Sequence, residues 1–137
     1  MNKFLTTKLS HQEIIDSVCS EIKEAFDTFK YSNERYNVPC SVLIKITNID
    51  IENDLKKHSR LTDIVISLQI DNLYLNVVFL PFTTGINAHG FLKNFEFKAI
   101  ANIKYGFDIF ELKKGIDIKK HLNDSLFEIK ENFDTIT

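Results

Sequence analysis

Glycine, proline and tryptophan are scarce in this chain, which has 4 glycines, 2 prolines and no tryptophan among 137 residues. A phosphate-cradling loop of the G-x-G-x-x-G or Walker type needs closely spaced glycines. The glycines here stand far apart, at Gly85, Gly90, Gly106 and Gly115. The sequence therefore disfavours nucleoside triphosphate chemistry through a glycine-rich loop.

Cysteine and histidine are also few, and none of them stands at a metal-ligand spacing. The 2 cysteines, Cys19 and Cys40, form no C-x-x-C pair. The 4 histidines occur singly, at His11, His58, His89 and His121. Structural zinc sites need clustered ligands, and the G-x-S-x-G elbow of serine hydrolases is absent. We therefore expect free thiols, no metal, no cofactor and no catalytic activity.

The chain has no block of charge of one sign. It carries 17 lysines and arginines against 19 aspartates and glutamates, which gives a formal net charge of −2. Its most basic stretch, 56–60, directly follows Glu52 and Asp54 and is predicted to be a solvated loop or a short helix. A nucleic-acid-binding protein needs a basic face that neutralises several phosphates. The sequence therefore indicates that nucleic acid is not a partner.

No apolar run approaches the length of a membrane span, and residues 1–8 lack the apolar core of a secretory signal. We therefore expect a cytoplasmic protein without membrane contact. Hydrophobic residues make up 44% of the chain and charged residues 26%, as in ordinary globular proteins. A length of 137 residues is enough for one core, so residues 1–137 are predicted to form a single domain.

The first predicted element is an amphipathic helix that begins at Ser10. Ser10 and Glu13 form a capping box, and Leu9 and Ile14 stand at the positions of a hydrophobic staple. Apolar residues then recur with helical spacing up to about Tyr31. Asparagine and proline interrupt this pattern, so residues 32–39 are predicted to be a loop.

Alternating apolar residues predict β-strands in the middle of the chain. Residues 42–47 form the first strand, and a change of phase near Asn48 indicates a bulge or a strand end. Residues 63–80 predict a hairpin around an Asp71-Asn72 turn, with four apolar pairs on one face. These pairs are Ile64 with Phe79, Ile66 with Val77, Leu68 with Leu75 and Ile70 with Leu73. A slip of one residue would mix apolar and polar sets, so burial specifies this register.

The remaining elements complete the predicted fold. The turn-rich segment 81–90 is predicted to be a loop, followed by a half-buried strand over 95–104 and another over 107–113. Apolar residues recur with helical spacing from Ile118 to Phe133, with Asp117 as N-cap, which predicts a second amphipathic helix. The predicted fold class is α+β, with an N-terminal helix, about five mostly antiparallel strands in one sheet and a C-terminal helix. Both helices are expected on one face of the sheet.

The opposite, outer face of the predicted sheet is a candidate contact surface. It carries more apolar side chains than a purely solvated face, namely Val65, Tyr74, Val78, Leu80 and Ile100. The alternative is that a helix or a loop of the same chain crosses this face.

The 81–90 loop supplies a second group of candidate binding residues. Hydroxyl, amide and imidazole groups gather there, and loops between rigid strands often carry binding groups. The candidates are Thr83, Thr84, Asn87 and His89. The alternative is a plain connection in which glycine permits a positive φ.

These features favour binding over catalysis. The leading hypothesis is a non-catalytic protein-binding module, in its most concrete form a bacterial immunity protein or a phage-borne inhibitor that neutralises a toxin or a defence enzyme. The alternative is a protein that sequesters or senses a nucleotide or metabolite, with a pocket between the sheet and the 81–90 loop or across a homodimer interface. A secretion chaperone fits less well because a more acidic chain would suit that role better. An enzyme is the third hypothesis.

Overall fold

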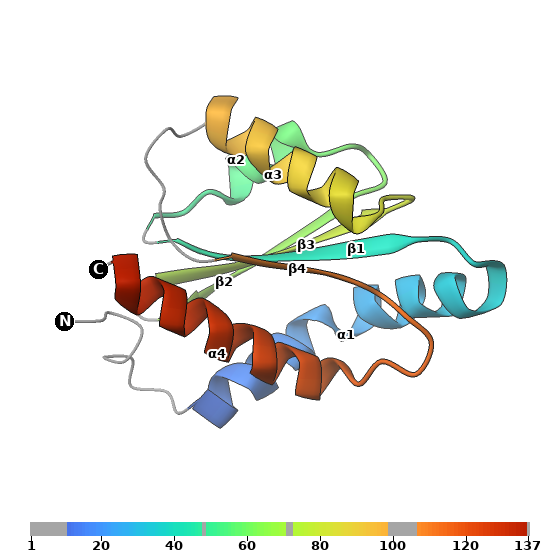
Figure 1. The fold of residues 1–137 in the computed structure, drawn as a ribbon, viewed down its shortest axis with the longest axis horizontal. Helices are drawn as coiled ribbons and strands as arrows, with labels where there is room; N and C mark the ends of the chain where they lie inside the picture. The colour runs from blue at the N-terminus through green and yellow to red at the C-terminus, as the bar shows by residue number, and fades with distance from the viewer. Residues whose placement is uncertain (1–10, 48, 71–72, 99–106, 137) are drawn as a thin grey trace.

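The computed structural model describes residues 11–47, 49–70, 73–98 and 107–136 (Figure 1). The elements in these ranges are, in order, α1 (His11–Tyr36), β1 (Cys40–Thr47), α2 (Glu52–His58), β2 (Ile64–Ile70), β3 (Leu73–Pro81), α3 (Gly85–Lys98), β4 (Phe107–Glu111) and α4 (Ile118–Ile136). The strands form one antiparallel sheet in the order β2-β3-β1-β4. This confirms the α+β prediction, with four strands in the described ranges where about five were expected.

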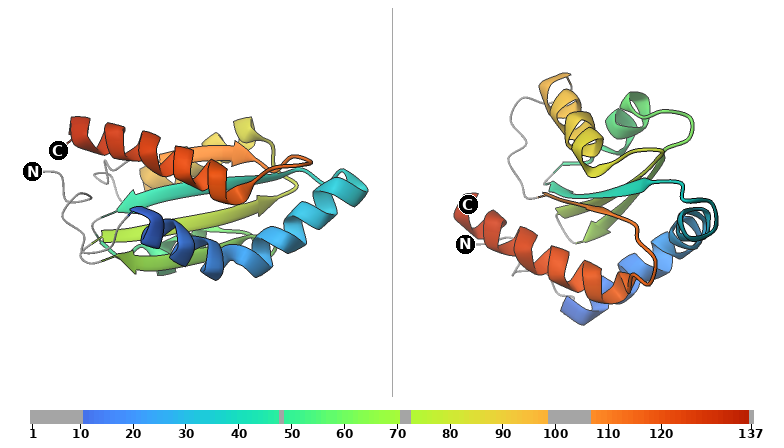
Figure 2. Two further views of the ribbon diagram at one scale, coloured as in Figure 1. Left: turned by 90° about the horizontal axis from the view of Figure 1, so that it is seen from below. Right: turned by 45° about the vertical axis from the view of Figure 1, so that its right-hand side comes forward.

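The connections between strands decide which helices share a face. β1, α2 and β2 form a split β-α-β unit because β3 lies between the two strands, and β3, α3 and β4 form a second unit around β1. This β-α-β-β-α-β order is the ferredoxin-like motif. α2 and α3 lie on one face of the sheet, while α1 and α4 cover the other (Figures 1 and 2).

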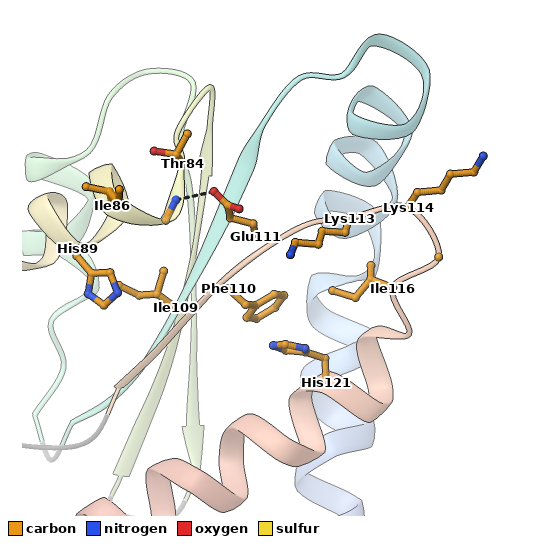
Figure 3. A pocket seen from close by; sticks show the side chains of 12 residues that line it. Thr84, Ile86, His89, Ile109, Phe110, Glu111, Lys113, Lys114, Ile116 and His121 are labelled. Carbon is orange, nitrogen blue, oxygen red and sulfur yellow. Dashed lines mark hydrogen bonds between the residues drawn. The ribbon is translucent and has the colours of Figure 1, made fainter.

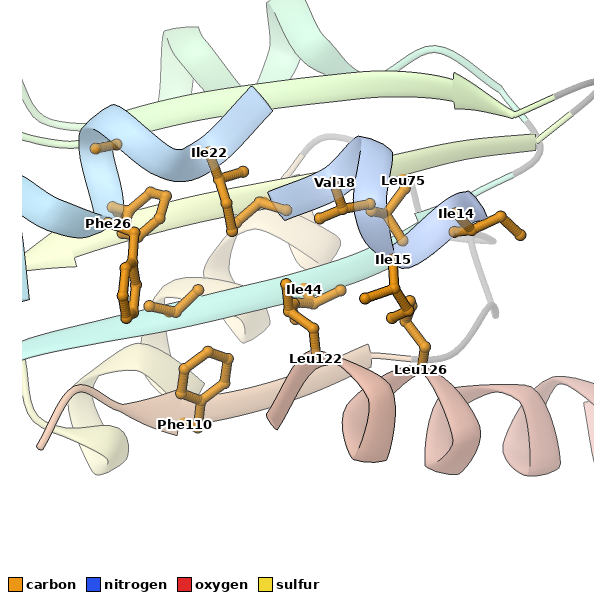
Figure 4. Packing of buried hydrophobic residues seen from close by; sticks show 14 of the residues in the cluster. Ile14, Ile15, Val18, Ile22, Phe26, Ile44, Leu75, Phe110, Leu122 and Leu126 are labelled. Atoms are coloured by element: carbon orange, nitrogen blue, oxygen red, sulfur yellow. The ribbon is translucent and has the colours of Figure 1, made fainter. Parts of the chain in front are cut away.

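The face under α1 and α4 holds the larger part of the described core. Val18 and Ile22 of α1, Ile44 of β1, and Leu122 and Leu126 of α4 are all 0% exposed. Figure 4 shows their side chains meeting between the two helices and the sheet. The predicted placement of the N-terminal and C-terminal helices on one sheet face is therefore confirmed.

β2 and β3 pair in the register that the apolar alternation predicted. The observed pairs are Ile64 with Phe79, Ile66 with Val77, Leu68 with Leu75 and Ile70 with Leu73. The predicted turn at 71–72 lies outside the described residues. β1 ends at Thr47, next to the predicted phase change, and β4 falls within the predicted strand 107–113.

α1 is longer than its apolar pattern indicated. The predicted loop 32–39 is wrong for residues 32–36, which continue the helix to Tyr36. These residues are largely solvent-exposed, so they extend the helix without extending the apolar stripe. Asn37 ends it with a left-handed φ of 56°, which asparagine tolerates better than most residues. Ser10 of the predicted capping box lies outside the described residues.

α3 replaces a predicted loop and a predicted strand. Ala88 and Leu92 stand one helical turn apart and are buried against the sheet at 0% and 4% exposure. The loop predicted over 81–90 is therefore wrong from Gly85 onward, and the strand predicted from residue 95 is wrong as far as Lys98. The apolar alternation at 95–97 competed with helical spacing, and packing on the sheet favours the helix. Residues 99–104 of the predicted strand lie outside the described residues.

None of the helices in the described ranges combines the length and the apolar character needed to cross a bilayer.

Candidate functional site

The outer sheet face is covered by the chain's own helices. Val78 and Leu80 are each 1% exposed and pack in one cluster with Leu55 of α2 and with Ala88 and Leu92 of α3. The expectation that these two side chains form an exposed contact surface is wrong, because the same chain crosses this face. This is the alternative that the sequence left open.

The other members of that predicted surface have different environments. Val65 and Tyr74 are half-buried, and Val65 packs at the margin of the cluster under α2 and α3. Ile100 lies outside the described residues. The structure therefore does not bring these residues together as one exposed patch.

The candidates from the predicted loop lie at the start of α3, where they divide between two hollows. Thr83 and Asn87 line a hollow of about 400 Å³ next to Arg60, which we call the Arg60 hollow. Thr84 and His89 line a hollow of about 750 Å³ beside β4, which we call the edge hollow. Thr83 is buried, whereas Thr84, Asn87 and His89 are exposed.

The Arg60 hollow lies between the turn before β2, the end of β3 and the first turns of α3. Its lining residues are Arg60, Leu80, Phe82, Thr83, Ile86, Asn87, Gly90 and Phe91. The lining is about half polar and half apolar, with Leu80, Phe82, Ile86 and Phe91 as its apolar side chains and Arg60 as its charged group. Small-molecule sites combine apolar and aromatic walls with a few placed polar groups, and this hollow has both, with a larger polar share than most.

A buried carboxylate holds Arg60 in place. The Asp63 side chain is 0% exposed and receives hydrogen bonds from Arg60 Nη2 at 2.8 Å and Arg60 Nε at 3.1 Å. The backbone N–H of Arg60 also donates to Asp63 Oδ2 at 2.8 Å. Arg60 Nε also donates to Asp63 Oδ2 at 3.3 Å, so the guanidinium contacts both oxygens of the carboxylate. Such a pairing fixes both the position and the plane of a guanidinium.

The same guanidinium bridges to the end of β3. Arg60 Nη2 lies 2.8 Å from Pro81 O and 2.8 Å from Thr83 Oγ1. Thr83 is itself tied to β1, because Ser41 Oγ donates to Thr83 O at 2.8 Å. The Arg60 side chain is nevertheless 51% exposed, and its Nη1 has no hydrogen-bond partner among the described residues. Arg60 is thus an ordered cation with donors left for a ligand.

Phe82 presents an aromatic ring at the same hollow. Its backbone has a left-handed φ of 60°, and its side chain is 65% exposed. The Phe82 N–H donates to Pro39 O at 2.6 Å, which anchors the turn. A positive φ at a bulky residue is strained, and such strain clusters at binding sites.

Sequence reasoning missed Arg60, Asp63 and Phe82 as site residues. The stretch 56–60 is predicted to be a solvated loop or a short helix because Glu52 and Asp54 lie just before it, and residues 56–58 do belong to the short helix α2. The usable signal was the spacing of Arg60 and Asp63 directly before a strand, since a three-residue separation allows an ion pair across a turn.

The edge hollow opens beside β4, between α3 and the start of α4 (Figure 3). Glu111 Oε1 accepts a hydrogen bond from Gly85 N at 2.7 Å and so caps the first turn of α3. The rings of His121 and Phe110 are in contact, with centroids 3.9 Å apart. Lys113 and Lys114, which follow β4 in the chain, also line the hollow and are exposed.

The described residues include no cluster of three or more histidine, cysteine, aspartate or glutamate side chains that could hold a metal ion. Burial raises the pKa of the Cys40 thiol to about 12, and burial also raises the pKa of Cys19. Thiols that resist ionisation are poor nucleophiles. Neither Cys19 nor Cys40 is therefore suited to act as a nucleophile in this structure.

Comparisons with known proteins show the fold. No family model matches the sequence, and no curated protein matches it. A solved structure of PelD from Pseudomonas aeruginosa PAO1 is similar over 91% of this chain and 47% of that one, with a TM-score of 0.56 and 16% identity. A PelD fragment from strain PA14 in complex with c-di-GMP matches 77% of this chain and 44% of that one, with a TM-score of 0.54 and 19% identity.

The apo form of the same fragment has a TM-score of 0.53 and 17% identity, over 90% of this chain and 46% of that one. This chain thus spans less than half the length of these PelD chains. At such low identity, the likeness shows a shared fold.

Proposed function

We propose that this chain is a non-catalytic nucleotide-binding module and that a cyclic dinucleotide of the c-di-GMP type binds at the Arg60 hollow. The observation that carries the proposal is the Arg60 guanidinium. It is fixed by the buried Asp63 carboxylate, yet it is 51% exposed in a hollow that combines polar groups with apolar and aromatic side chains.

The chemistry of the hollow suits a guanine nucleotide. The free Nη1 of Arg60 can donate to the O6 or N7 acceptor of guanine, and it can also donate to a phosphate oxygen. Phe82 offers an exposed ring on which a base can stack, an interaction worth ~1–3 kcal/mol. c-di-GMP supplies the guanine acceptors, the stacking base and the phosphate, since it carries two guanines and two phosphates.

The size of the hollow limits what it can enclose. Ligand pockets usually measure ~300–1,000 Å³, and the Arg60 hollow is near the lower end at about 400 Å³. We therefore place one base in the hollow and the sugar-phosphate ring at its mouth. Asn87 of α3 and Arg60 lie on that lining and supply polar contacts.

The structural neighbours support testing this ligand first. A PelD fragment of the same fold was solved in complex with c-di-GMP. The likeness is one of fold at 19% identity, so Arg60, Asp63 and Phe82 are the residues of this chain that support the ligand.

Isothermal titration with c-di-GMP tests the proposal directly. We expect saturable binding, with weaker binding of c-di-AMP, because adenine offers Arg60 only one acceptor on the same edge. A ligand at 100 times its dissociation constant should also stabilise the fold by about 2.7 kcal/mol. No heat and no thermal stabilisation with c-di-GMP, GMP, c-di-AMP or inorganic phosphate would refute nucleotide binding.

Arg60→Lys locates the site. Lysine keeps the charge beside the buried Asp63 but loses the planar fork, so we expect about tenfold weaker binding or more. Arg35→Lys is the matched control, because Arg35 is the other arginine of the chain and lies at the end of α1. Equal effects of the two substitutions would place the ligand elsewhere.

Phe82→Gly tests the stacking contact independently of charge. Glycine adopts the φ of 60° without strain, so the fold should be retained while the ring is lost. We expect about tenfold weaker binding of c-di-GMP and little change in the affinity for inorganic phosphate. Unchanged c-di-GMP binding would exclude a base stacked on Phe82.

The immunity or inhibitor role stays a prediction. Val78 and Leu80 are no longer part of its contact surface, because both side chains are buried. A cytoplasmic location is part of the present proposal, and the free thiols of Cys19 and Cys40 are consistent with a reducing compartment.

A further inference from the structure

β4 is at the edge of the sheet, and its hydrogen-bonding pattern can be assigned. The sheet order ends with β4, whose partner is β1. Leu112 N donates to Cys40 O at 2.9 Å. In an antiparallel pair, residues that face the partner strand alternate with residues that face away. The N–H and C=O groups of Ile109 and Glu111 therefore point to the open edge.

The edge hollow runs alongside these outward-facing groups. Ile109, Phe110 and Glu111 line it, so the described parts of the chain leave this stretch of β4 accessible. Its lining also includes Ile86 of α3 and Ile116 from the loop before α4, which supply apolar surface on either side of the strand (Figure 3).

The rim of the edge hollow is basic. Lys113 and Lys114 are exposed and make no ion pair with any described residue. His89 and His121 contribute imidazoles to the lining. The acidic side chain there, Glu111, is already engaged with Gly85 N at 2.7 Å. The charge at the edge thus favours an acidic partner.

We propose that the β4 edge binds an extended acidic peptide segment of a partner protein, which adds a strand beside β4. The backbone of the segment pairs with Ile109 and Glu111, as in other cases of strand addition to a sheet edge. Alternate side chains of the segment enter the hollow on the Ile86 side and the Ile116 side. Its acidic groups meet Lys113 and Lys114. This inference is independent of nucleotide binding at the Arg60 hollow.

A second copy of this chain is a poorer occupant of the edge. Pairing two β4 edges would bring two copies of the same basic rim together, while the Glu111 carboxylate of each copy is already engaged with Gly85 N. Exposed edges are also commonly protected by lysine. If the lysines served only to prevent pairing at this edge, no peptide would bind there. The following experiment distinguishes that role from peptide binding.

The probe is an acetylated, amidated heptapeptide of alternating glutamate and valine, and its control has lysine in place of glutamate. Binding is followed by the amide spectrum of the ¹⁵N-labelled protein and by hydrogen exchange of the Ile109 and Glu111 amides. We expect the acidic peptide to protect these two amides and the basic peptide to leave them exchanging freely. Equal binding of both peptides, or protection of neither amide, would overturn the proposal.

Ile109→Pro removes the outward N–H without removing a bond to β1, and Ile109→Val keeps it. Proline is tolerated on an edge strand when its missing donor faces outward. We expect the proline variant to lose acidic-peptide binding and the valine variant to keep it, with both still cooperatively folded. Equal binding by the two folded variants would contradict strand addition.

Neutralising the two lysines of the rim tests the proposal independently, even if the Ile109→Pro variant does not fold. Lys113→Gln with Lys114→Gln should weaken acidic-peptide binding about tenfold at low salt. Lys56→Gln with Lys57→Gln on α2 is the control, with the same change of net charge and no expected effect. Equal weakening by both pairs would exclude the basic rim. Concentration-dependent protection of Ile109 without peptide would instead assign the edge to a second copy.

Discussion

The two faces of the sheet are covered in different ways. α1 and α4, of 26 and 19 residues, pack across one face and bury a continuous apolar cluster. The 7-residue α2 and the 14-residue α3 cover the other face, with α3 contributing residues to both hollows. The difference is that the α1/α4 face is filled by one large apolar cluster, whereas the margins of the α2/α3 face carry the hollows at which we propose binding.

The α2/α3 face nevertheless depends on burial of its own. Leu43 and Val78 lie beneath α2 and α3 at 0% and 1% exposure. Both hollows therefore sit on a packed layer, which keeps their polar groups at fixed positions.

Val78→Asp gives the largest expected effect, because it tests whether the α2/α3 face is covered at all. An unpaired carboxylate at this buried position should cost at least ~4 kcal/mol and largely unfold the chain. Phe127→Asp on α4 is the control, since Phe127 is 57% exposed and its replacement should be nearly neutral. Far-ultraviolet circular dichroism with urea titration measures both. A folded Val78→Asp variant with an unchanged midpoint would mean that the face is open.

Ile44→Ala and Leu43→Ala compare the two layers through neighbouring residues of β1. Both side chains are 0% exposed, but they pack in the clusters on opposite faces. Each truncation should cost ~2–5 kcal/mol through lost transfer energy and the cavity it leaves. The readout is the free energy of unfolding from chemical denaturation at constant m-value. A cost below ~1 kcal/mol for Leu43→Ala alone would show that the α2/α3 layer collapses or is loosely packed.

The same two faces differ in how far the sequence could predict them. α1, α4 and the β2-β3 hairpin have sustained apolar periods, so their type and the hairpin register could be derived before any coordinates were known. α3 has few described apolar anchors, Ala88 and Leu92, and it contains Gly85 and Gly90, which are poor helix formers. Packing on the sheet decides its conformation, and packing is not visible in a local window.

The Arg60 hollow could not be predicted for a related reason. Arg60 and Asp63 are near in sequence, but Pro81 and Thr83 reach the guanidinium only after β3 has paired with its neighbours. An arginine and an aspartate three residues apart have the same spacing whether they form only a surface ion pair or also hold the arginine at a hollow. What distinguishes them is the long-range contact to the end of β3.

Asp117→Ala has a smaller expected effect, on the helix that closes the α1/α4 face. Asp117 Oδ1 accepts a hydrogen bond from Lys120 N at 3.2 Å, which confirms its predicted N-cap role. Losing this cap should destabilise the protein by about 1 kcal/mol. Asp117→Asn keeps an acceptor and should be close to neutral in the same thermal unfolding experiment. Equal losses for the two variants would show that charge, not capping, is the contribution of Asp117.

The smallest expected effect concerns the ion pair that joins the two long helices. Lys119 Nζ lies 2.8 Å from Asp16 Oδ1, and the Lys119 hydrogen bond, with help from Gln12, lowers the pKa of Asp16 below its usual 3.8. The Asp16 hydrogen bond in turn raises the pKa of Lys119 above 10.5. The stabilisation should be present between these limits. It is lost as pH falls through the lowered pKa of Asp16 or rises through the raised pKa of Lys119.

Asp16→Asn should therefore lower the unfolding midpoint slightly at neutral pH, and its difference from the parent chain should vanish in acid. Asp27→Asn is the control, because Asp27 pairs with Lys23 within α1 and does not link the helices. Both pairs are exposed, so added salt should shrink both effects. If only Asp16→Asn increases hydrogen exchange in α4, the pair joins the two layers of this face. Identical exchange in the two variants would show that the Asp16–Lys119 pair is a surface contact that does not hold α1 and α4 together.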